Sequence, residues 1–428
     1  MSARNRELLA LVPASLLLTA GFTAVFVQRD DVLSDVSLTY GAVFLGLTFC
    51  VHLLLRFTLR EADPYLFPLI AVLACLGLVM IYRIDEELAR EQAQWFVVGL
   101  FAFTGTIVFL RDYSVLERYR YTIALIGLVL LLLPRFGTPV NGAYLSFKAG
   151  PITFQPAELA KICIIVFLAS YLRDTRQLLV VAGRRFLGLT LPPLKHFGPL
   201  LVVWGAAMAM LFVIQDIGSS LMFFGGFLAV LYVATDRLTY PLAGLALFAA
   251  GARVLYAIRP TIESRVDAWQ NPFDPTLYAA DGGSYQLAQA LFAQGDGGLS
   301  GRGFGQAILE VRDLPILPAA HTDLIYAVIV NELGLIGACG VIVAYLLIVQ
   351  RGFKIAVLAR DSFSKLLATG LTAVFALQVF VIVGGVTKVI PLTGVTLPFI
   401  SYGGSSIVAN FILLALLLLV SDKARRPG

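Results

Sequence analysis

The chain has 428 residues, of which 59% are hydrophobic and 14% are charged, and its formal net charge is +5. A mean hydropathy of +0.86 excludes an ordinary soluble domain. The four cysteines lie in apolar runs without disulfide or zinc spacing, and the three histidines form no ligand cluster, which argues against a metal site made of protein nitrogens.

Hydrophobic stretches recur along the whole chain. A spanning helix needs about 20 mostly apolar residues, and such stretches are centred near residues 18, 48, 74, 102, 128, 164, 206, 226, 248, 334, 374 and 410. The first has no small-residue cleavage site followed by a soluble domain, so we expect a retained helix and not a signal peptide. The sequence predicts an all-α polytopic membrane protein with about 12 transmembrane helices.

The basic residues predict the orientation of these helices. With the N-terminus in the cytoplasm, 20 of the 32 Lys and Arg residues fall in inside segments and 11 fall outside. This asymmetry predicts that both termini are cytoplasmic. The net positive charge then reflects topology, and we expect no nucleic-acid partner.

One outside connection, residues 259–323, is far longer than the others. It includes "NPFDPTLYAADGGSYQ" (residues 271–286), which has two prolines and a Gly-Gly pair and contains no run expected to form a helix. Loops of this length in compact proteins are usually functional or disordered. The aromatic residues of this loop predict that it packs.

Several ionisable residues lie in apolar stretches, where each should face protein or a wet cavity. Glu158 and Lys161 are three apart on one helix face, so they either pair with each other or line a polar cavity. Asp216, in "VIQDIGSS", is expected to cap a helix or to take part in chemistry. Glu332 is expected to be a buried pair partner or part of the same cavity.

The last outside connection, residues 384–406, reads "GGVTKVIPLTGVTLPFISYGGSS" and carries one cation, Lys388. Irregular backbone at membrane depth is tolerated only where protein or water satisfies it. We therefore expect a loop that dips back and lines a cleft; the alternative is an ordinary turn before a Gly-rich helix start.

Five segments between about residues 65 and 421 resemble motifs of the SEDS family, the shape, elongation, division and sporulation proteins that include RodA and FtsW. They are "GPITFQPAELAK", "IQDIGSS", "YQLAQALFAQGDGGLSGRGFG", "LPAAHTDLIYAVIVNELGLIG" and "PLTGVTLPFISYGGSS". The approach "VTKVIP" and the short C-terminal tail favour a RodA-like member. Because the family core has ten spans, the resemblance implies that residues 1–60 form two additional N-terminal helices and that residues 61–428 form the glycosyltransferase core.

The resemblance implies a peptidoglycan glycosyltransferase that polymerises lipid II at the outer face of the bacterial cytoplasmic membrane. Its implied partners are lipid II, a class B penicillin-binding protein and membrane lipids; a divalent cation such as Mg²⁺ or Mn²⁺ could assist, with no ligands assigned. A lipid II flippase or transporter, and a non-catalytic scaffold of the elongation or division complex, are the alternatives.

Asp274 is the predicted catalytic base, because flanking prolines fix its backbone and the family's essential acid likewise precedes a proline shortly after Trp-x-Asn-Pro. Asp281 is the alternative base, and an Asx-Pro turn without chemistry is the structural alternative. Lys161, Lys388 and Arg265 are expected to supply positive charge. The residues expected to contact the substrate are Gln155, Glu158, Lys161, Asp216, Gln286, His321, Asp323, Lys388, Ser401 and Ser405.

Overall fold

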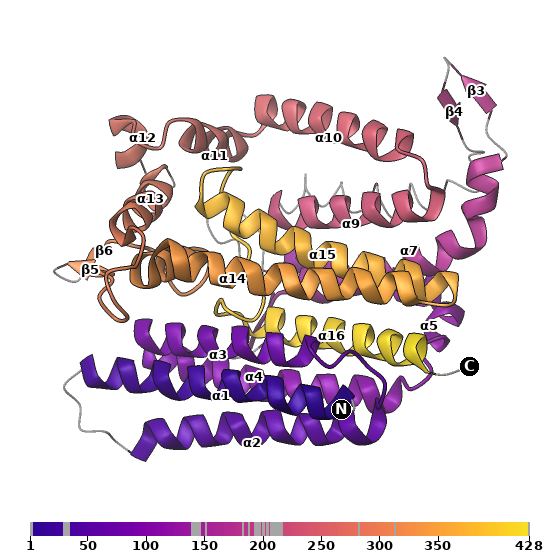
Figure 1. The fold of residues 1–428 in the computed structure, drawn as a ribbon. Helices are drawn as coiled ribbons and strands as arrows, with labels where there is room; N and C mark the ends of the chain where they lie inside the picture. The colour runs from indigo at the N-terminus through magenta and orange to yellow at the C-terminus, as the bar shows by residue number, and fades with distance from the viewer. Residues whose placement is uncertain are drawn as a thin grey trace. The chain divides into compact units, whose positions relative to one another are not determined.

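The structure is a computed structural model that describes residues 3–28, 35–137, 147–149, 152–181, 184–186, 189–191, 198, 202, 205, 217–280, 283–311 and 314–426. Its helices up to residue 181 are α1 (Ala3–Gln28), α2 (Asp35–Thr58), α3 (Leu66–Ile84), α4 (Glu86–Phe109), α5 (Val115–Arg118), α6 (Arg120–Leu132), the 3₁₀ helix η1 (Leu133–Phe136) and α7 (Pro156–Val181). The later helices are α9 (Ile217–Thr235), α10 (Thr239–Ile258), α11 (Pro260–Gln270), α12 (Pro275–Ala279), α13 (Tyr285–Gly297), α14 (Ile325–Leu358), α15 (Ser362–Val386) and α16 (Gly404–Arg425) (Figure 1).

Strands are confined, in the described part of the chain, to three short antiparallel hairpins. They pair β1 (Phe147–Ala149) with β2 (Ile152–Phe154), β3 (Arg184–Phe186) with β4 (Leu189–Leu191), and β5 (Glu310–Val311) with β6 (Leu314–Pro315). The predicted all-α polytopic class is confirmed, since every long element is a helix.

Within the described residues, eight helices are long and apolar enough to cross a membrane, and they match the predicted spans near residues 48, 74, 102, 226, 248, 334, 374 and 410. The stretch near 128 forms only the 13-residue α6, followed by a short 3₁₀ turn. The predicted span near 206 lies outside the described residues. The total of twelve spans therefore stays a prediction.

The chain forms two compact units. The first comprises Met1–Arg111, Ser264–Arg351 and Gln378–Gly428, and the second comprises Asp112–Glu263 and Gly352–Leu377. In the first unit, α4 packs against α16 and α3, and α1 packs against α2 and α3. Phe411 of α16 meets Phe96 and Phe103 of α4 edge-on, at ring distances of 5.4 and 6.2 Å. Gly99 permits this approach, because a Cβ there would lie 2.5 Å from the Phe411 ring.

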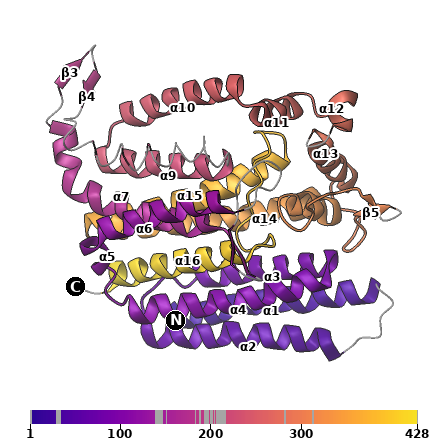
Figure 2. The same cartoon turned by 180° about the vertical axis from the view of Figure 1, so that it is seen from behind.

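The second unit is held by close contacts between its helices: α6 and α9 each pack on α7, and α9 packs on α10 (Figure 2). A Cβ at Gly370 in α15 would lie 2.6 Å from Ile165, and one at Gly226 in α9 would lie 2.4 Å from Val374. Small residues that let backbones approach are the usual means of packing helices in lipid, where no hydrophobic force drives them together.

A buried ionic cluster joins α1 to α2. Glu7 is fully buried; it pairs with Arg4 one turn earlier, and its Oε1 accepts a hydrogen bond from Nδ1 of His52 at 2.7 Å. Arg4 also donates to the carbonyl oxygen of Ala62. These contacts join α1 to α2 and to the α2–α3 connection within the first unit, and removing one partner would leave an uncompensated buried charge.

A second cluster joins the α2–α3 connection to the end of α16. Asp63 is fully buried and its carboxylate pairs with Arg425 and, at 3.4 Å, with Arg351. Its backbone N–H donates to Oγ of Ser421 at 3.0 Å. The backbone N–H of Glu61 donates to Asp422 at 2.9 Å. The last turn of α16 is therefore part of the folded core.

Residues 259–323 are more helical than the sequence indicated. The stretch 271–286 contains α12 and the start of α13, so the expectation of a helix-free run was wrong. The five-residue α12 begins at Pro275, a residue well suited to the first turn of a helix. The prediction that the loop packs is confirmed: the tilted rings of Phe273 and Phe292 lie 5.3 Å apart, and Tyr278 meets Tyr285 edge-on at 5.1 Å.

Candidate functional site

Asp274 is the N-cap residue of α12. Its Oδ1 accepts hydrogen bonds from the backbone N–H groups of Thr276 at 2.8 Å and Leu277 at 3.2 Å, and from the Thr276 hydroxyl. The hydroxyl of Thr276, followed by the two N–H groups, holds the pKa of this exposed carboxyl below its usual range. All three bonds fall on Oδ1, so Oδ2 is the oxygen that the described residues leave accessible to an incoming hydroxyl.

The turn after α12 sets the angle between α12 and α13. The N–H of Ser284, a fully buried residue, donates to the carbonyl oxygen of Leu277 at 3.0 Å. A Cβ at Gly283 would lie 1.9 Å from that same oxygen, so only glycine fits there. Gln289 on α13 donates to the Tyr278 hydroxyl at 2.7 Å. The helix that carries Asp274 is thereby fixed to a longer helix.

Two side chains connect this loop to the end of α15. Nε1 of Trp269, at the end of α11, donates to the carbonyl oxygen of Lys388 at 3.0 Å. Nε2 of Gln294 on α13 donates to the carbonyl oxygen of Val386 at 2.9 Å. Carbonyl groups at helix C-termini lack intrahelical partners, and these donors supply them. Lys388 has a φ of 60°, an uncommon left-handed conformation for a side-chain-bearing residue, and this contact supports it.

Glu158 and Lys161 form a buried ion pair on α7 in the second unit, with Lys161 Nζ 2.6 Å from Glu158 Oε2. Both side chains are at most 3% exposed. The predicted pair is confirmed. The alternative role in substrate contact stays a prediction, as does a shared cavity with Lys388, which belongs to the first unit.

The segment between α15 and α16 is irregular and hydrogen-bonded to its surroundings. Ser401 is buried; its hydroxyl donates to the carbonyl oxygen of Thr322 at 2.7 Å and accepts from the N–H of Leu397 at 2.8 Å. Gln92 on α4 donates to the Ser401 carbonyl oxygen at 3.2 Å and accepts from Gly403 N–H at 3.1 Å. The backbone of this stretch is irregular, as predicted, and Ser401 has a structural role in it. That the loop lines a cleft stays a prediction.

His321 lies against the same loop. Its ring meets that of Tyr402 edge-on at 5.8 Å, and its carbonyl oxygen accepts from the Tyr402 N–H at 2.8 Å. Burial lowers the pKa of His321, an effect that the more distant Asp85 carboxylate only partly offsets, so the ring is neutral at physiological pH. A neutral imidazole can donate and accept a hydrogen bond at once.

Helix α14 is broken at Gly334, where φ is 68° and ψ is −174°. The loop segment that follows α13 satisfies the backbone groups freed by this break. The N–H of Leu335 donates to the Gly298 carbonyl oxygen at 3.0 Å, and the N–H of Gly303 donates to the Glu332 carbonyl oxygen at 3.1 Å. A Cβ at Gly334 would lie 2.3 Å from the N of Gly301, so the two chains meet at a distance only glycine permits.

Glu332, beside this break, was predicted either to form a buried ion pair or to line the polar cavity. The structure shows the ion pair. Nε of Arg83 on α3 lies 3.2 Å from Glu332 Oε1. The Arg83 guanidinium also donates to the carbonyl oxygens of Gly305 and Ala307, at 2.8 and 2.7 Å. The sequence analysis did not identify Arg83 as the partner of Glu332. The available signal was its position as a cation in the last turn of the apolar helix α3.

The remaining predicted residues are dispersed. Gln155 precedes α7, Gln286 lies in the first turn of α13, Asp323 lies just before α14, and Ser405 is buried in the first turn of α16. Asp323 and His321 share the segment against the α15–α16 loop, where a Cβ at Gly394 would lie 3.5 Å from an Asp323 oxygen. Asp216 and Asp281 lie outside the described residues.

In the described ranges, His, Cys, Asp and Glu side chains form no group of three or more that could hold an ion. Lys388, after α15, and Arg265, on α11, are the predicted cations of this region, and the loop also contacts Arg83 and contains Arg302. A carboxylate fixed by an N-cap, with basic residues on neighbouring segments, can accept a proton while the cations stabilise a developing anion.

Comparison with known proteins identifies the family. A sequence model of cell cycle proteins of the FtsW, RodA and SpoVE type matches residues 64–426. The chain belongs to the FtsW/RodA/SpoVE family. It therefore belongs to the SEDS proteins that its motifs resemble.

Curated relatives of this chain are named as peptidoglycan glycosyltransferases or as a sporulation protein. It is 40% identical to the peptidoglycan glycosyltransferase RodA of Mycobacterium tuberculosis, over 99% of this chain and 92% of that protein. It is 33% identical to a probable peptidoglycan glycosyltransferase FtsW of Geobacter metallireducens, over 88% and 99% of the two chains. Stage V sporulation protein E of Bacillus subtilis is 30% identical, over 86% and 100%.

Solved structures share the fold of this family member. The rod shape determining protein RodA of Thermus thermophilus matches with a TM-score of 0.60 and 26% identity, over 86% of this chain and 98% of that one. A chain from a study of how a peptidoglycan synthase complex coordinates polymerization and crosslinking matches with a TM-score of 0.67 and 25% identity, over 86% and 99%.

Proposed function

We propose that this chain is a peptidoglycan glycosyltransferase that polymerises lipid II at the outer face of the bacterial cytoplasmic membrane. The observation that carries the proposal is the fixed Asp274 carboxylate, on a loop that Trp269 anchors to the backbone of Lys388. Full-length relatives named peptidoglycan glycosyltransferase support it.

Asp274 acts as the general base. The acceptor sugar hydroxyl forms a bond to the anomeric carbon of the donor, the bond from that carbon to pyrophosphate breaks, and the hydroxyl proton passes to Oδ2 of Asp274. A carboxylate with a lowered pKa is fully ionised at neutral pH, and it is suited to a hydroxyl that becomes acidic only as the new bond forms. One carboxylate is sufficient, because pyrophosphate leaves without protonation.

Positive charge stabilises the leaving pyrophosphate. Lys388 and Arg265 are the candidate cations of the first unit, and Lys161, released from Glu158, is the candidate of the second. Gln155, Glu158, Asp216, Gln286, His321, Asp323, Ser401 and Ser405 are proposed to contact or shape the lipid-linked substrate. Cations fixed before the reaction stabilise charge that develops in the transition state at little reorganisation cost.

The proposed cellular setting follows from the same family membership. Both termini lie in the cytoplasm, residues 1–60 supplement the core, and a class B penicillin-binding protein crosslinks the product; the structural relative from a peptidoglycan synthase complex supports such a partner. The favoured role is that of a RodA-type elongation enzyme, supported by the 40% identity to a RodA over nearly the whole chain.

Polymerisation of lipid II by the purified full-length protein tests the proposal. Asn caps helices about as well as Asp, whereas Ala costs about 0.5–2 kcal/mol of cap stability. A catalytic role predicts that Asp274→Asn and Asp274→Ala are equally inactive, while a purely capping role predicts an active Asp274→Asn. Glu263→Gln, another exposed acid-to-amide change in this region, is the control and should polymerise normally.

The same variants separate the alternatives. A flippase would move labelled lipid II across vesicle membranes with or without Asp274, and would make no glycan. A scaffold would do neither and would only retain its transpeptidase. Glycan formation by the wild type that Asp274→Asn abolishes, with partner binding unchanged, supports the enzyme.

A further inference from the structure

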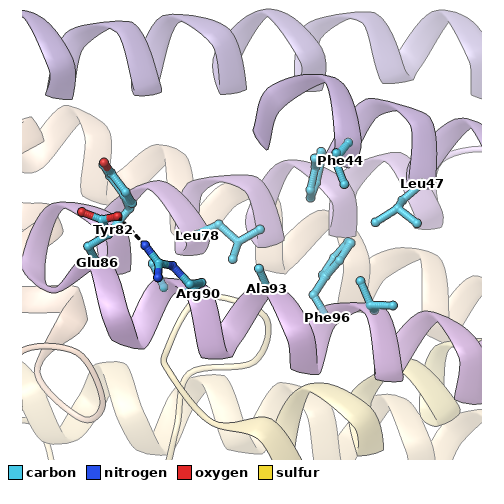
Figure 3. Close-up of a pocket in the computed structure, with 11 residues that line it drawn as sticks. Phe44, Leu47, Leu78, Tyr82, Glu86, Arg90, Ala93 and Phe96 are labelled. Carbon is cyan, nitrogen blue, oxygen red and sulfur yellow. Dashed lines mark hydrogen bonds and ion pairs between the residues drawn. The ribbon is translucent and has the colours of Figure 1, made fainter. Parts of the chain in front are cut away.

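An apolar groove lies between α2 and the α3–α4 pair, and none of its lining residues is assigned to the glycosyltransferase site. Leu47 on α2, Leu78 on α3 and Ala93 on α4 contribute to its walls (Figure 3), and its cavity volume is about 80 Å³. Its residues belong to one compact unit, and α2 supplies one of the three walls.

The two ends of the groove differ in chemistry. Towards one end the rings of Phe44 and Phe96 stack at 5.1 Å. At the other end lie Tyr82 and the exposed ion pair of Arg90 with Glu86, whose atoms are 3.0 Å apart. Figure 3 shows the pair at the mouth and the apolar side chains along the length.

The position of the pair marks a membrane surface. Two candidate spans, Leu66–Ile84 and Glu86–Phe109, turn around at Asp85, so the mouth lies where the chain leaves the hydrocarbon. From Glu86 to Phe96 along α4 is about 15 Å at 1.5 Å per residue. That depth is about half of the roughly 30 Å hydrocarbon core of a bilayer. The groove therefore has the depth of one leaflet.

We propose that this groove binds an acyl chain of a zwitterionic phospholipid with a free ammonium group, of the phosphatidylethanolamine class. The phosphate accepts from Arg90 and the ammonium donates to Glu86, so the head group replaces an exposed ion pair with two pairs of opposite sign. Arg90 and Glu86 are 61% and 45% exposed, and an exposed pair contributes little stability by itself, so separating it costs little. A lipid whose head group carries only a phosphate would place that anion beside the Glu86 carboxylate. An uncharged lipid would pair with neither Arg90 nor Glu86.

Photocrosslinking tests the site. Full-length protein in nanodiscs is exposed to phosphatidylethanolamine that carries a diazirine halfway along one acyl chain, and labelled peptides are mapped. We expect labelling of the α2, α3 and α4 peptides that contain Leu47, Leu78 and Ala93, reduced at least fivefold by Ala93→Phe. Val98→Phe places the same side chain at a 46% exposed position of α4 and should leave the labelling unchanged.

Arg90→Gln changes only the exposed mouth, so it tests the site even if Ala93→Phe folds poorly; it should reduce labelling about threefold or more. Equal labelling of wild type, Ala93→Phe and Arg90→Gln would overturn the proposal. So would stronger labelling by a phosphatidylglycerol or polyprenyl-phosphate probe of the same design, or a change of oligomeric state in Ala93→Phe that assigns the groove to a second copy of the chain.

Discussion

The indole N–H of Trp269 donates to the backbone carbonyl oxygen of Lys388 at 3.0 Å, and so joins two segments more than a hundred residues apart in the sequence. Trp269 lies five positions before Asp274. This contact relates the proposed base to the proposed cation through one short stretch of chain. The first prediction removes it.

Trp269→Phe should keep the ring contacts of the indole but lose the hydrogen bond. A net hydrogen bond is worth about 0.5–1.5 kcal/mol, so we expect polymerisation of lipid II to fall by up to about tenfold. Initial rates measured beside thermal stability in detergent check this. Trp269→Ala should fall further, and a Trp269→Phe enzyme with the wild-type rate would mean that the contact does not position the base.

The pH dependence of the reaction should follow Asp274. Its pKa is depressed, so the base form persists to low pH and activity is lost only as the pH falls through that depressed value. Thr276→Val removes the largest cause of the depression, so the acid limb of kcat/KM should move to higher pH. An acid limb that stays in place in Thr276→Val would indicate that another group controls it. Thr387→Val, a similar change at a helix end where the hydroxyl donates to the carbonyl oxygen of Val383, is the control.

Lys161→Met should destabilise the second unit by about 3–5 kcal/mol, because the buried Glu158 carboxylate loses its 2.6 Å partner. The double variant Glu158→Gln with Lys161→Met should recover much of that stability. If the pair also contacts substrate, the stable double variant will still fail to polymerise lipid II. Thermal unfolding and polymerisation, measured on the same samples, separate the two roles; normal polymerisation by the double variant would limit the pair to structure.

Gly334→Ala should destabilise the first unit. The residue has a φ of 68°, and a Cβ would lie 2.3 Å from the N of Gly301. Strained conformations of this kind cost about 1–3 kcal/mol before any clash is counted. Gly340→Ala on the same helix, where nothing lies within 4 Å, should be neutral or stabilising. Melting temperatures of the two variants in the same detergent provide the comparison, and equal values would contradict the close approach.

The predicted orientation can be checked with single cysteines. Leu299→Cys lies at a 66% exposed position of the long loop, and Lys423→Cys lies at the exposed end of α16. A membrane-impermeant thiol reagent should modify only the former in intact cells, on a background in which the native cysteines are replaced. Labelling at 423 and protection at 299 would reverse the topology.

Local patterns in the sequence predicted the features that depend on neighbouring residues. Glu158 and Lys161 are three apart, and that spacing on a helix brings them together without any knowledge of the fold. The long apolar runs likewise predicted eight of the observed helices. The short α12 was missed, because a five-residue helix that begins at a proline is too short to show a hydrophobic period.

Features made by distant segments could not be predicted. The partner of Glu332 is Arg83 on another helix, and no spacing rule relates the two. The break at Gly334 lies inside an apolar run that reads as one continuous span, and only the arrival of Gly301 makes it stable. The roles of Trp269 and Gln294 as donors to the end of α15 are of the same kind, since they depend on how the loop folds back.

The contacts of Asp63 have a practical consequence for handling the protein. The last residues of α16 supply Ser421, Asp422 and Arg425 to the connection between α2 and α3. Exopeptidase trimming or truncation at residue 420 would therefore leave a buried carboxylate with one fewer cation and two backbone N–H groups without their acceptors. An affinity tag should follow residue 428 with a spacer. A protein shortened at the end of α16 should be assayed for the integrity of the connection between α2 and α3.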